Sequence, residues 1–154
     1  MKKKYLFVIL FFILLFIDQI SKFLVINFLN DKIVFIDNFF IFEFIKNDGA
    51  AFGLFGGNII FLVLITLFLI IYLIYDLKKH FNSKFYVICV ILVLSGAVGN
   101  LIDRIFYGYV VDFISFILFN NQMPIFNFAD ICVTFGIIGL VYSMLKEGSL
   151  WKSL

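Results

Sequence analysis

The chain has 154 residues, of which 64% are hydrophobic and 14% charged, and its mean hydropathy is +1.15. Ordinary soluble domains are about one-quarter charged, so this composition argues against a soluble monomer and favours one domain, 1–154, set in lipid. The formal net charge is only +2, which excludes the strongly basic surface of a nucleic-acid-binding protein.

Four apolar stretches divide the sequence, each close to the roughly 20 residues that cross a hydrocarbon core as a helix. Such stretches are too long and too uniformly apolar for the alternating strands of a membrane barrel. We therefore predict an all-α membrane protein with four transmembrane helices, at about 5–29, 59–75, 85–102 and 128–145.

The first stretch follows three lysines and so resembles a cleavable signal peptide, but no small-x-small cleavage site follows it. We predict one uncleaved helix with a polar turn inside it. Asp18 and Lys22 lie four residues apart and share one helix face. An ion pair that orients the helix and a role in supporting a polar site both explain them.

The next connection contains two short aromatic and β-branched runs, 33–36 and 39–45, which predict a β-hairpin resting in the membrane interface. It closes with the segment 47–53, which begins with Asn47 and contains Gly49. Glycine and alanine permit a tight turn there, so the segment by itself indicates a turn more than a site.

The third stretch ends with Asn100, Asp103 and Arg104, whose spacing predicts that an amide, a carboxylate and a guanidinium share one face. An Asp–Arg pair that anchors the helix at the outer interface would explain two of them. Arg104 is nevertheless the sole arginine, and a guanidinium is favoured where planar, multi-donor bonding matters.

Two more acids follow in the second long connection and at the start of the last span. Asp112 lies in an extended apolar segment, which is expected to raise the pKa of its carboxyl group. Asn127 is a predicted N-cap of the last helix with Asp130 in its first turn, so helix capping alone could explain this pair. Both acids should reach the outer membrane edge.

The lysines predict the orientation, because cytoplasmic segments of membrane proteins are enriched in positive charge. Both termini and the connection after the second span are therefore expected in the cytoplasm, and connections 30–58 and 103–127 outside. The lysines that support this are Lys2, Lys3, Lys4, Lys78, Lys79, Lys84, Lys146 and Lys152.

Two carboxylates held close together cannot both ionise easily, so one can act as a general acid while the other activates water. Other hydrolytic schemes fit poorly. The single histidine, His80, lies in the cytoplasmic connection, which argues against a Ser–His pair or a histidine-rich metal site. Cys89 and Cys132 lie in apolar runs and are interpreted as core residues.

Together, five polar blocks resemble the bacterial lipoprotein signal peptidases, also called signal peptidase II. They occur in the family order from residue 18 to 130. The matches are Asp18, Ser21 and Lys22; Asn47, Gly49, Ala50, Ala51 and Phe52; Gly96, Ala97, Gly99, Asn100, Asp103 and Arg104; Val110, Asp112 and Phe113; and Asn127, Ala129 and Asp130.

The resemblance implies an aspartic peptidase of the bacterial inner membrane with Asp112 and Asp130 as its catalytic dyad at the outer face. Its substrates would be prolipoproteins, cut just before a diacylglyceryl-modified cysteine, with the outer hairpin as a cradle over them. It implies no metal or cofactor, and we expect a monomer in the phospholipid bilayer. Supporting roles fall to Asn47, Gly49, Asn100, Asp103, Arg104, Asn127, Asp18 and Lys22.

Two other classes remain open on the residues alone. A small transporter or channel could use the acids as proton or cation relays, but a relay predicts acids spread through the depth of the bundle. A purely structural membrane subunit explains the spans but leaves the costly outer acids without a task.

Overall fold

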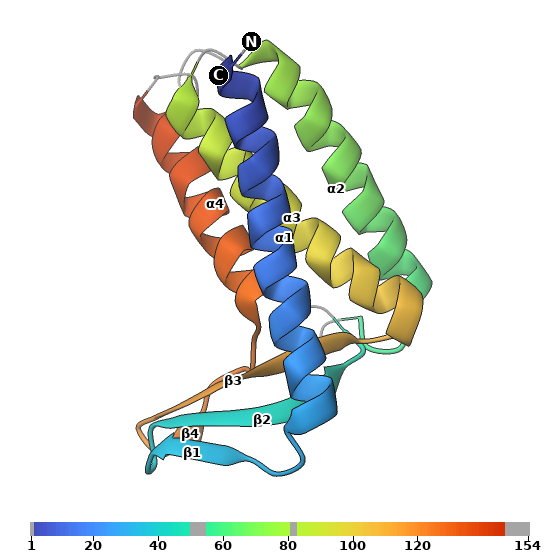
Figure 1. Ribbon diagram of the computed structural model, residues 1–154, viewed down its shortest axis with the longest axis vertical. Helices are drawn as coiled ribbons and strands as arrows, with labels where there is room; N and C mark the ends of the chain where they lie inside the picture. The colour runs from blue at the N-terminus through green and yellow to red at the C-terminus, as the bar shows by residue number, and fades with distance from the viewer. Residues whose placement is uncertain (1, 50–54, 81–82, 147–154) are drawn as a thin grey trace.

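The computed structural model describes residues 2–49, 55–80 and 83–146, which form four long helices and a four-stranded sheet (Figure 1). The helices are α1 (Lys2–Phe28), α2 (Ile59–Lys79), α3 (Lys84–Tyr107) and α4 (Phe128–Lys146), and the strands are β1 (Ile33–Ile36), β2 (Phe40–Asn47), β3 (Val110–Leu118) and β4 (Asn121–Gln122).

All four helices are long and apolar enough to cross a membrane, which confirms the predicted spans. α1 continues without a break through its polar turn, since Asp18 and Lys22 are buried against neighbouring elements. α3 extends five residues beyond its predicted end, to Tyr107, where Gly108 takes the left-handed conformation (φ 76°) that terminates helices. Asp103 and Arg104 therefore belong to the helix itself.

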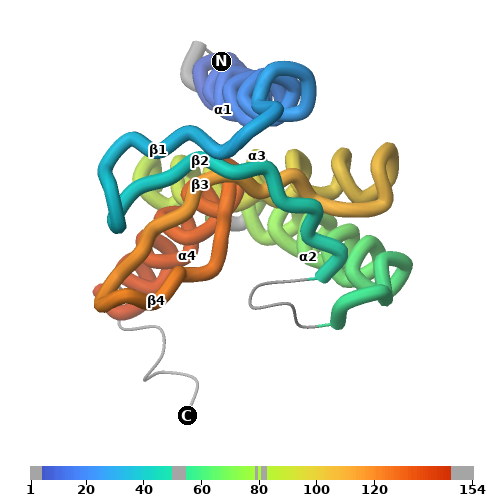
Figure 2. The backbone as a smooth tube through the Cα atoms, turned by 90° about the horizontal axis from the view of Figure 1, so that it is seen from below, coloured from blue at the N-terminus to red at the C-terminus, as the bar shows by residue number. Residues whose placement is uncertain are grey.

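α3 is the central helix and contacts each of the other three, as the view along the bundle also shows (Figure 2). In its most apolar window 61% of the residues are buried, against 11–22% in the other helices. Lipid solvates apolar side chains as well as a protein interior does, so the hydrophobic effect does not drive membrane helices together. They associate instead through close packing of small residues. Here Gly96 of α3 and Gly136 of α4 bring the two backbones together. Cys89 and Cys132 are buried free thiols, as predicted.

The sheet is larger than the predicted hairpin. β1 and β2 form that hairpin, but β3 pairs antiparallel with β2 and β4 with β3, giving the order β1-β2-β3-β4. Sequence reasoning identified only part of β3 as extended, because β3 is specified by its pairing with a strand about 70 residues earlier.

The sheet lies at the end of the bundle where α1 ends and α4 begins, opposite the α2–α3 connection (Figure 1). Val111 and Phe113 of β3 pack against Val25 of α1 in a buried apolar cluster. Since side chains alternate along a strand, Asp112 points to the other face, toward α3 and α4.

Candidate active site

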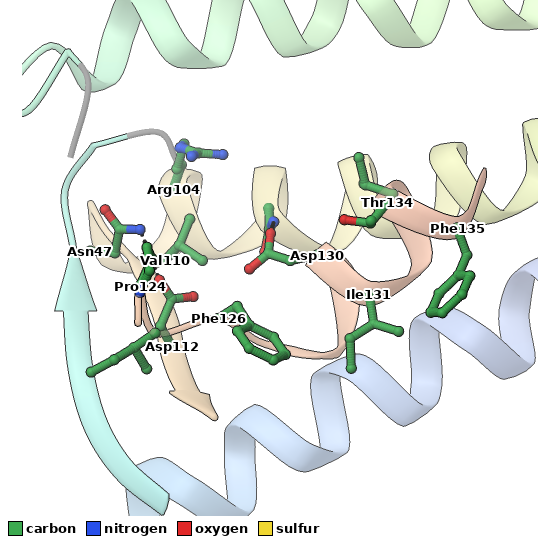
Figure 3. Close-up of a pocket in the computed structure, with 13 residues that line it drawn as sticks. Asn47, Arg104, Val110, Asp112, Pro124, Phe126, Asp130, Ile131, Thr134 and Phe135 are labelled. Carbon is green, nitrogen blue, oxygen red and sulfur yellow. Dashed lines mark hydrogen bonds between the residues drawn. The ribbon is translucent and has the colours of Figure 1, made fainter. Parts of the chain in front are cut away.

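A cavity of about 510 Å³ lies between α3, α4 and the sheet (Figure 3). In Figure 3, Asn47 and Asp112 lie at its sheet end, whereas Thr134 and Phe135 lie farther along α4. The lining residues are Asn47, Asn100, Arg104, Val110, Asp112, Pro124, Ile125, Phe126, Asp130, Ile131, Val133, Thr134 and Phe135. Five of the predicted site residues therefore share one cavity.

Asp112 is buried at the sheet end of this cavity and accepts two amide hydrogen bonds. Asn47 Nδ2 donates to its Oδ2 at 2.8 Å, and Asn127 Nδ2 donates to its Oδ1 at 2.7 Å. Burial, followed by the charge of Asp130, raises the pKa of Asp112 from 3.8 to about 6. This agrees with the expectation from its apolar neighbours.

Asp130 lies in the first turn of α4, where it forms a reciprocal cap with Asn127. The Asp130 N–H donates to Asn127 Oδ1 at 3.0 Å, and the Asn127 N–H donates to Asp130 Oδ2 at 3.1 Å. The other carboxylate oxygen, Oδ1, accepts Asn100 Nδ2 at 2.8 Å. The predicted cap is confirmed, and the capping carboxylate also faces the cavity.

Asn127 connects the two acids. Its side chain is fully buried, and its Nδ2 lies within hydrogen-bonding distance of Asp112, of Asn100 Oδ1 at 3.2 Å and of the Val111 carbonyl at 3.3 Å. One amide thus contacts both the strand and the helix that carry the acids, which fixes the position of one acid relative to the other.

Lys22 lies behind this site in a fully buried polar cluster. Its ammonium group contacts Asp18 at 3.0 Å, Asp103 at 2.9 Å and Asn100 Oδ1 at 2.8 Å. The Asp18–Lys22 pair is therefore more than a local helix pair, because it supports α3 as well. Asp103 faces this cluster and pairs with Lys22. It does not form the Asp–Arg pair with Arg104 that would have anchored α3 at the outer interface.

Each acid of the buried cluster also accepts a backbone hydrogen bond from an element of the site. Asp18 Oδ1 accepts from the Ala129 N–H of α4 at 3.0 Å, and Asp103 Oδ2 accepts from the Val111 N–H of β3 at 3.1 Å. α1 and α3 thereby hold the residues directly before Asp130 and Asp112.

Gln19 is a member of this cluster that sequence reasoning missed. Its Nε2 lies 3.1 Å from Asp18, 3.2 Å from Asp103 and 3.3 Å from the Gly99 carbonyl. Its place next to Asp18 in an otherwise apolar span was the available signal, because an amide in a membrane helix also needs partners.

Arg104 lies at the sheet end of α3 and donates from one terminal nitrogen to the Gly49 carbonyl at 3.0 Å. The Gly49 N–H in turn donates to Asn47 Oδ1 at 3.0 Å. The segment that begins at Asn47, predicted as a turn, therefore also contacts Arg104 of the site. Among the described residues, Arg104 Nε has no hydrogen-bond acceptor although it is buried. Ala50, Ala51 and Phe52 of the same motif lie outside the described residues.

Within ranges 2–49, 55–80 and 83–146, no three His, Cys, Asp or Glu side chains cluster so that they could hold an ion. The polar groups around Asp112 and Asp130 are instead amides, a guanidinium and the second carboxyl group.

Comparison with known proteins gives a consistent result. The family described as signal peptidase (SPase) II matches residues 10–146. The lipoprotein signal peptidase of Clostridium novyi is 46% identical over 146 residues, covering 92% of this chain and 97% of the relative. That of Staphylococcus haemolyticus is 34% identical over 155 residues, covering 97% and 98%.

Solved structures agree as well. A structure described as a bacterial membrane enzyme, obtained by the in meso method at 2.3 Å, superimposes with a TM-score of 0.85 at 32% identity. The match covers 93% of this chain and 89% of the other. Of the three classes that the residues left open, these matches select the peptidase. With its four spans, small sheet and five motifs in order, the chain belongs to the signal peptidase II family.

Proposed function

We propose that this protein removes the signal peptide from diacylglyceryl-modified prolipoproteins by cutting before the lipidated cysteine, with Asp112 and Asp130 as an aspartic dyad. Family membership supports a peptidase that acts on prolipoproteins. The observation that carries the dyad is the convergence of two carboxylates from different elements on one cavity, joined through Asn127.

The environments of the two acids differ. Asp112 is deeply buried and its pKa is raised to about 6, which favours a proton on that carboxyl group. Asp130 accepts hydrogen bonds from a backbone N–H at a helix N-terminus and from the amide of Asn100. A dyad that shares one proton can supply both an acid and a base.

In the proposed reaction the ionised carboxylate removes a proton from water, and the resulting hydroxide attacks the scissile carbonyl carbon. The protonated carboxyl group donates a hydrogen bond to the carbonyl oxygen as it becomes negative. The tetrahedral intermediate then collapses, the C–N bond breaks, and a dyad proton passes to the leaving nitrogen. The products are a signal peptide with a new carboxylate and a lipoprotein with a free amino group on its cysteine.

Arg104 is assigned to substrate binding. Its buried Nε has no acceptor among the described residues. A buried donor without an acceptor destabilises the folded protein, and a ligand that accepts its hydrogen bond removes this cost. A backbone carbonyl of an extended substrate would supply the acceptor, while Gly49 holds the other end of the guanidinium.

The remaining site residues are assigned to positioning. Asn47, Asn100 and Asn127 orient the carboxylates, and the cluster of Asp18, Lys22 and Asp103 holds the backbones next to them. We propose that the sheet forms a cradle at the outer membrane face and that the protein acts there as a monomer. The lysine distribution supports this orientation.

The test is cleavage of a precursor with and without diacylglyceryl on its cysteine, by purified protein in lipid. Asp112→Asn and Asp130→Asn should stay folded but lose cleavage by at least about a thousandfold, since each removes one half of the acid–base pair. Asp37→Asn in the exposed β1–β2 turn is the matched control and should cleave normally. Normal processing by either dyad variant contradicts the dyad, and equal cleavage of the unlipidated precursor contradicts the substrate class.

A further inference from the structure

A second cavity, of about 530 Å³, adjoins the first at Asp112. Asn47, Asp112, Pro124 and Ile125 line both cavities. The two spaces therefore meet at the proposed catalytic carboxylate, and the pair is called the trough.

The two halves of the trough differ in chemistry. The first half continues along α4 past Ile131 and Phe135, between apolar side chains of membrane-spanning helices (Figure 3). The described residues that line the second half come from strands and connections and not from the helices. This half is bounded by residues 45–48, at and just after the end of β2, by Asp112 of β3, and by residues 122–125, which end β4 and follow it.

From this difference we infer that the second cavity binds the first residues of the mature lipoprotein, immediately after the lipidated cysteine. The inference rests on the proposed function. An exported precursor has an apolar signal peptide that stays in the membrane and a polar mature chain that must reach water. A chain laid over Asp112 satisfies both needs only if its signal-peptide side occupies the helix half and its mature side the sheet half.

The polar groups of the second cavity fit a peptide better than an acyl chain. Asp48 is an exposed carboxylate at its rim. Gln122 is held in place by its amide nitrogen, which donates to Ser115 Oγ at 3.0 Å and to Glu43. An acyl chain would leave these groups facing hydrocarbon, which is unfavourable.

The charge of the cavity is expected to select among mature chains. The Lys46 ammonium group keeps its charge but is held 5.1 Å from the centre of the Tyr109 ring, and Tyr109 does not line the cavity. Asp48 then gives the rim a negative character. Basic residues after the cysteine should be favoured over acidic ones, by a modest factor because the carboxylate is solvated.

The placement can be tested by photo-crosslinking of a lipidated precursor to the Asp112→Asn protein in lipid. A benzophenone amino acid two residues after the cysteine should crosslink to Met123, which is 42% exposed in the second cavity. One placed three residues before the cysteine should crosslink to Thr134 or Phe135. Met144 is equally exposed at the far end of α4 and serves as the internal control, since it should capture neither probe.

Capture of the mature-side probe by Thr134 or Phe135, or by any residue outside the second cavity, overturns the placement. Wild-type protein assayed in parallel separates the two hypotheses. If wild type does not cleave the lipidated precursor, the proposed function fails. If it cleaves the precursor but the probe crosslinks elsewhere, only the second-cavity inference fails.

Charge reversal provides an independent measurement. For wild type at low ionic strength, kcat/KM should be about two- to fivefold higher with lysine than with aspartate two residues after the cysteine. Asp48→Lys should reverse that ratio, whereas Asp37→Lys, the same change in the β1–β2 turn, should keep it. An identical ratio in wild type and Asp48→Lys overturns the proposed charge selection.

Discussion

Lys22 determines how the amide of Asn100 is oriented. An ammonium group can only donate hydrogen bonds, so the atom of Asn100 that faces Lys22 at 2.8 Å must be the amide oxygen. The amide nitrogen is thereby turned toward Asp130 Oδ1. A residue of α1 thus acts on Asp130 through one intermediate side chain, and it counts as a positioning residue.

Replacing Lys22 should be severely destabilising. Lys22→Met leaves the carboxylates of Asp18 and Asp103 buried without their cation, which costs on the order of 3–5 kcal/mol. We expect a large drop in the thermal unfolding temperature in detergent. The triple variant Asp18→Asn, Lys22→Met, Asp103→Asn should recover much of it, because no unpaired charge remains. If Lys22→Met alone were as stable as wild type, the buried ion cluster would not contribute to stability as proposed.

The raised pKa of Asp112 predicts a pH dependence. Below about pH 6 Asp112 keeps its proton, and above it Asp112 loses that proton and with it the capacity to act as general acid. We expect kcat/KM to fall as the pH rises through about 6. The apparent pKa values of this profile describe the two coupled carboxyl groups together and not either residue alone.

Folding stability should also decline as the pH rises from 3.8 to about 6, since the folded state binds the extra proton there.

The measurement is the pH profile of kcat/KM for the lipidated precursor, with Asp37→Asn as a control that should leave it unchanged. A profile that stays flat up to pH 8 contradicts a shared proton that is lost near pH 6.

The close contact of α3 with α4 decides whether Asn100 can reach Asp130. A Cβ atom on Gly96 would lie 2.3 Å from the Ala129 carbonyl oxygen and 2.8 Å from Val133 Cγ2. The helices therefore approach as closely as two backbones allow, one turn away from the Asn100–Asp130 hydrogen bond.

Gly96→Ala should separate the two helices and lower kcat by more than about tenfold, since displacements near 1 Å can cost a hundredfold in rate. Gly139→Ala is the matched control at the same interface. Its Cβ would meet the Cys89 and Phe85 side chains near the other end of the helices, where side-chain adjustment is easier. Equal activity of the two variants would contradict the hypothesis that the distance between α3 and α4 positions Asp130 for catalysis.

At one end of the molecule α1 starts and α2 ends, and at the other end lies the sheet (Figure 1). Lysines cluster in the sequence at the first end, and the cavity lies next to the sheet. The positive-inside rule predicts that the lysine end is cytoplasmic. The rule acts through segments near the membrane ends of the helices, and eight of the twelve basic residues lie in the segments predicted to be cytoplasmic.

Cysteine labelling in intact cells checks this orientation. In a background with alanine at Cys89 and Cys132, Asp37→Cys should react with an impermeable maleimide added outside. Lys78→Cys should react only after the membrane is permeabilised. The opposite pattern would place the cavity in the cytoplasm and remove it from the path of an exported precursor.

Much of this architecture follows from local features of the sequence. The four spans follow from apolar length alone, because lipid requires helices with every backbone group paired internally. The Asn127–Asp130 cap and the shared face of Asp18 and Lys22 follow from helix periodicity, which acts over three to four residues. The five spaced motifs were sufficient to indicate the family.

The tertiary structure decided which of these groups meet. Lys22 with Asp103, Asn127 with Asp112, and Arg104 with Gly49 are contacts across 15 to 81 residues of sequence. No local pattern specifies such contacts, because they depend on how α1 and α4 pack on α3 and how β3 adds to the β1–β2 hairpin. The sequence thus determined which polar residues needed partners in the membrane, and only the packing of the helices and sheet determined which partner each one has.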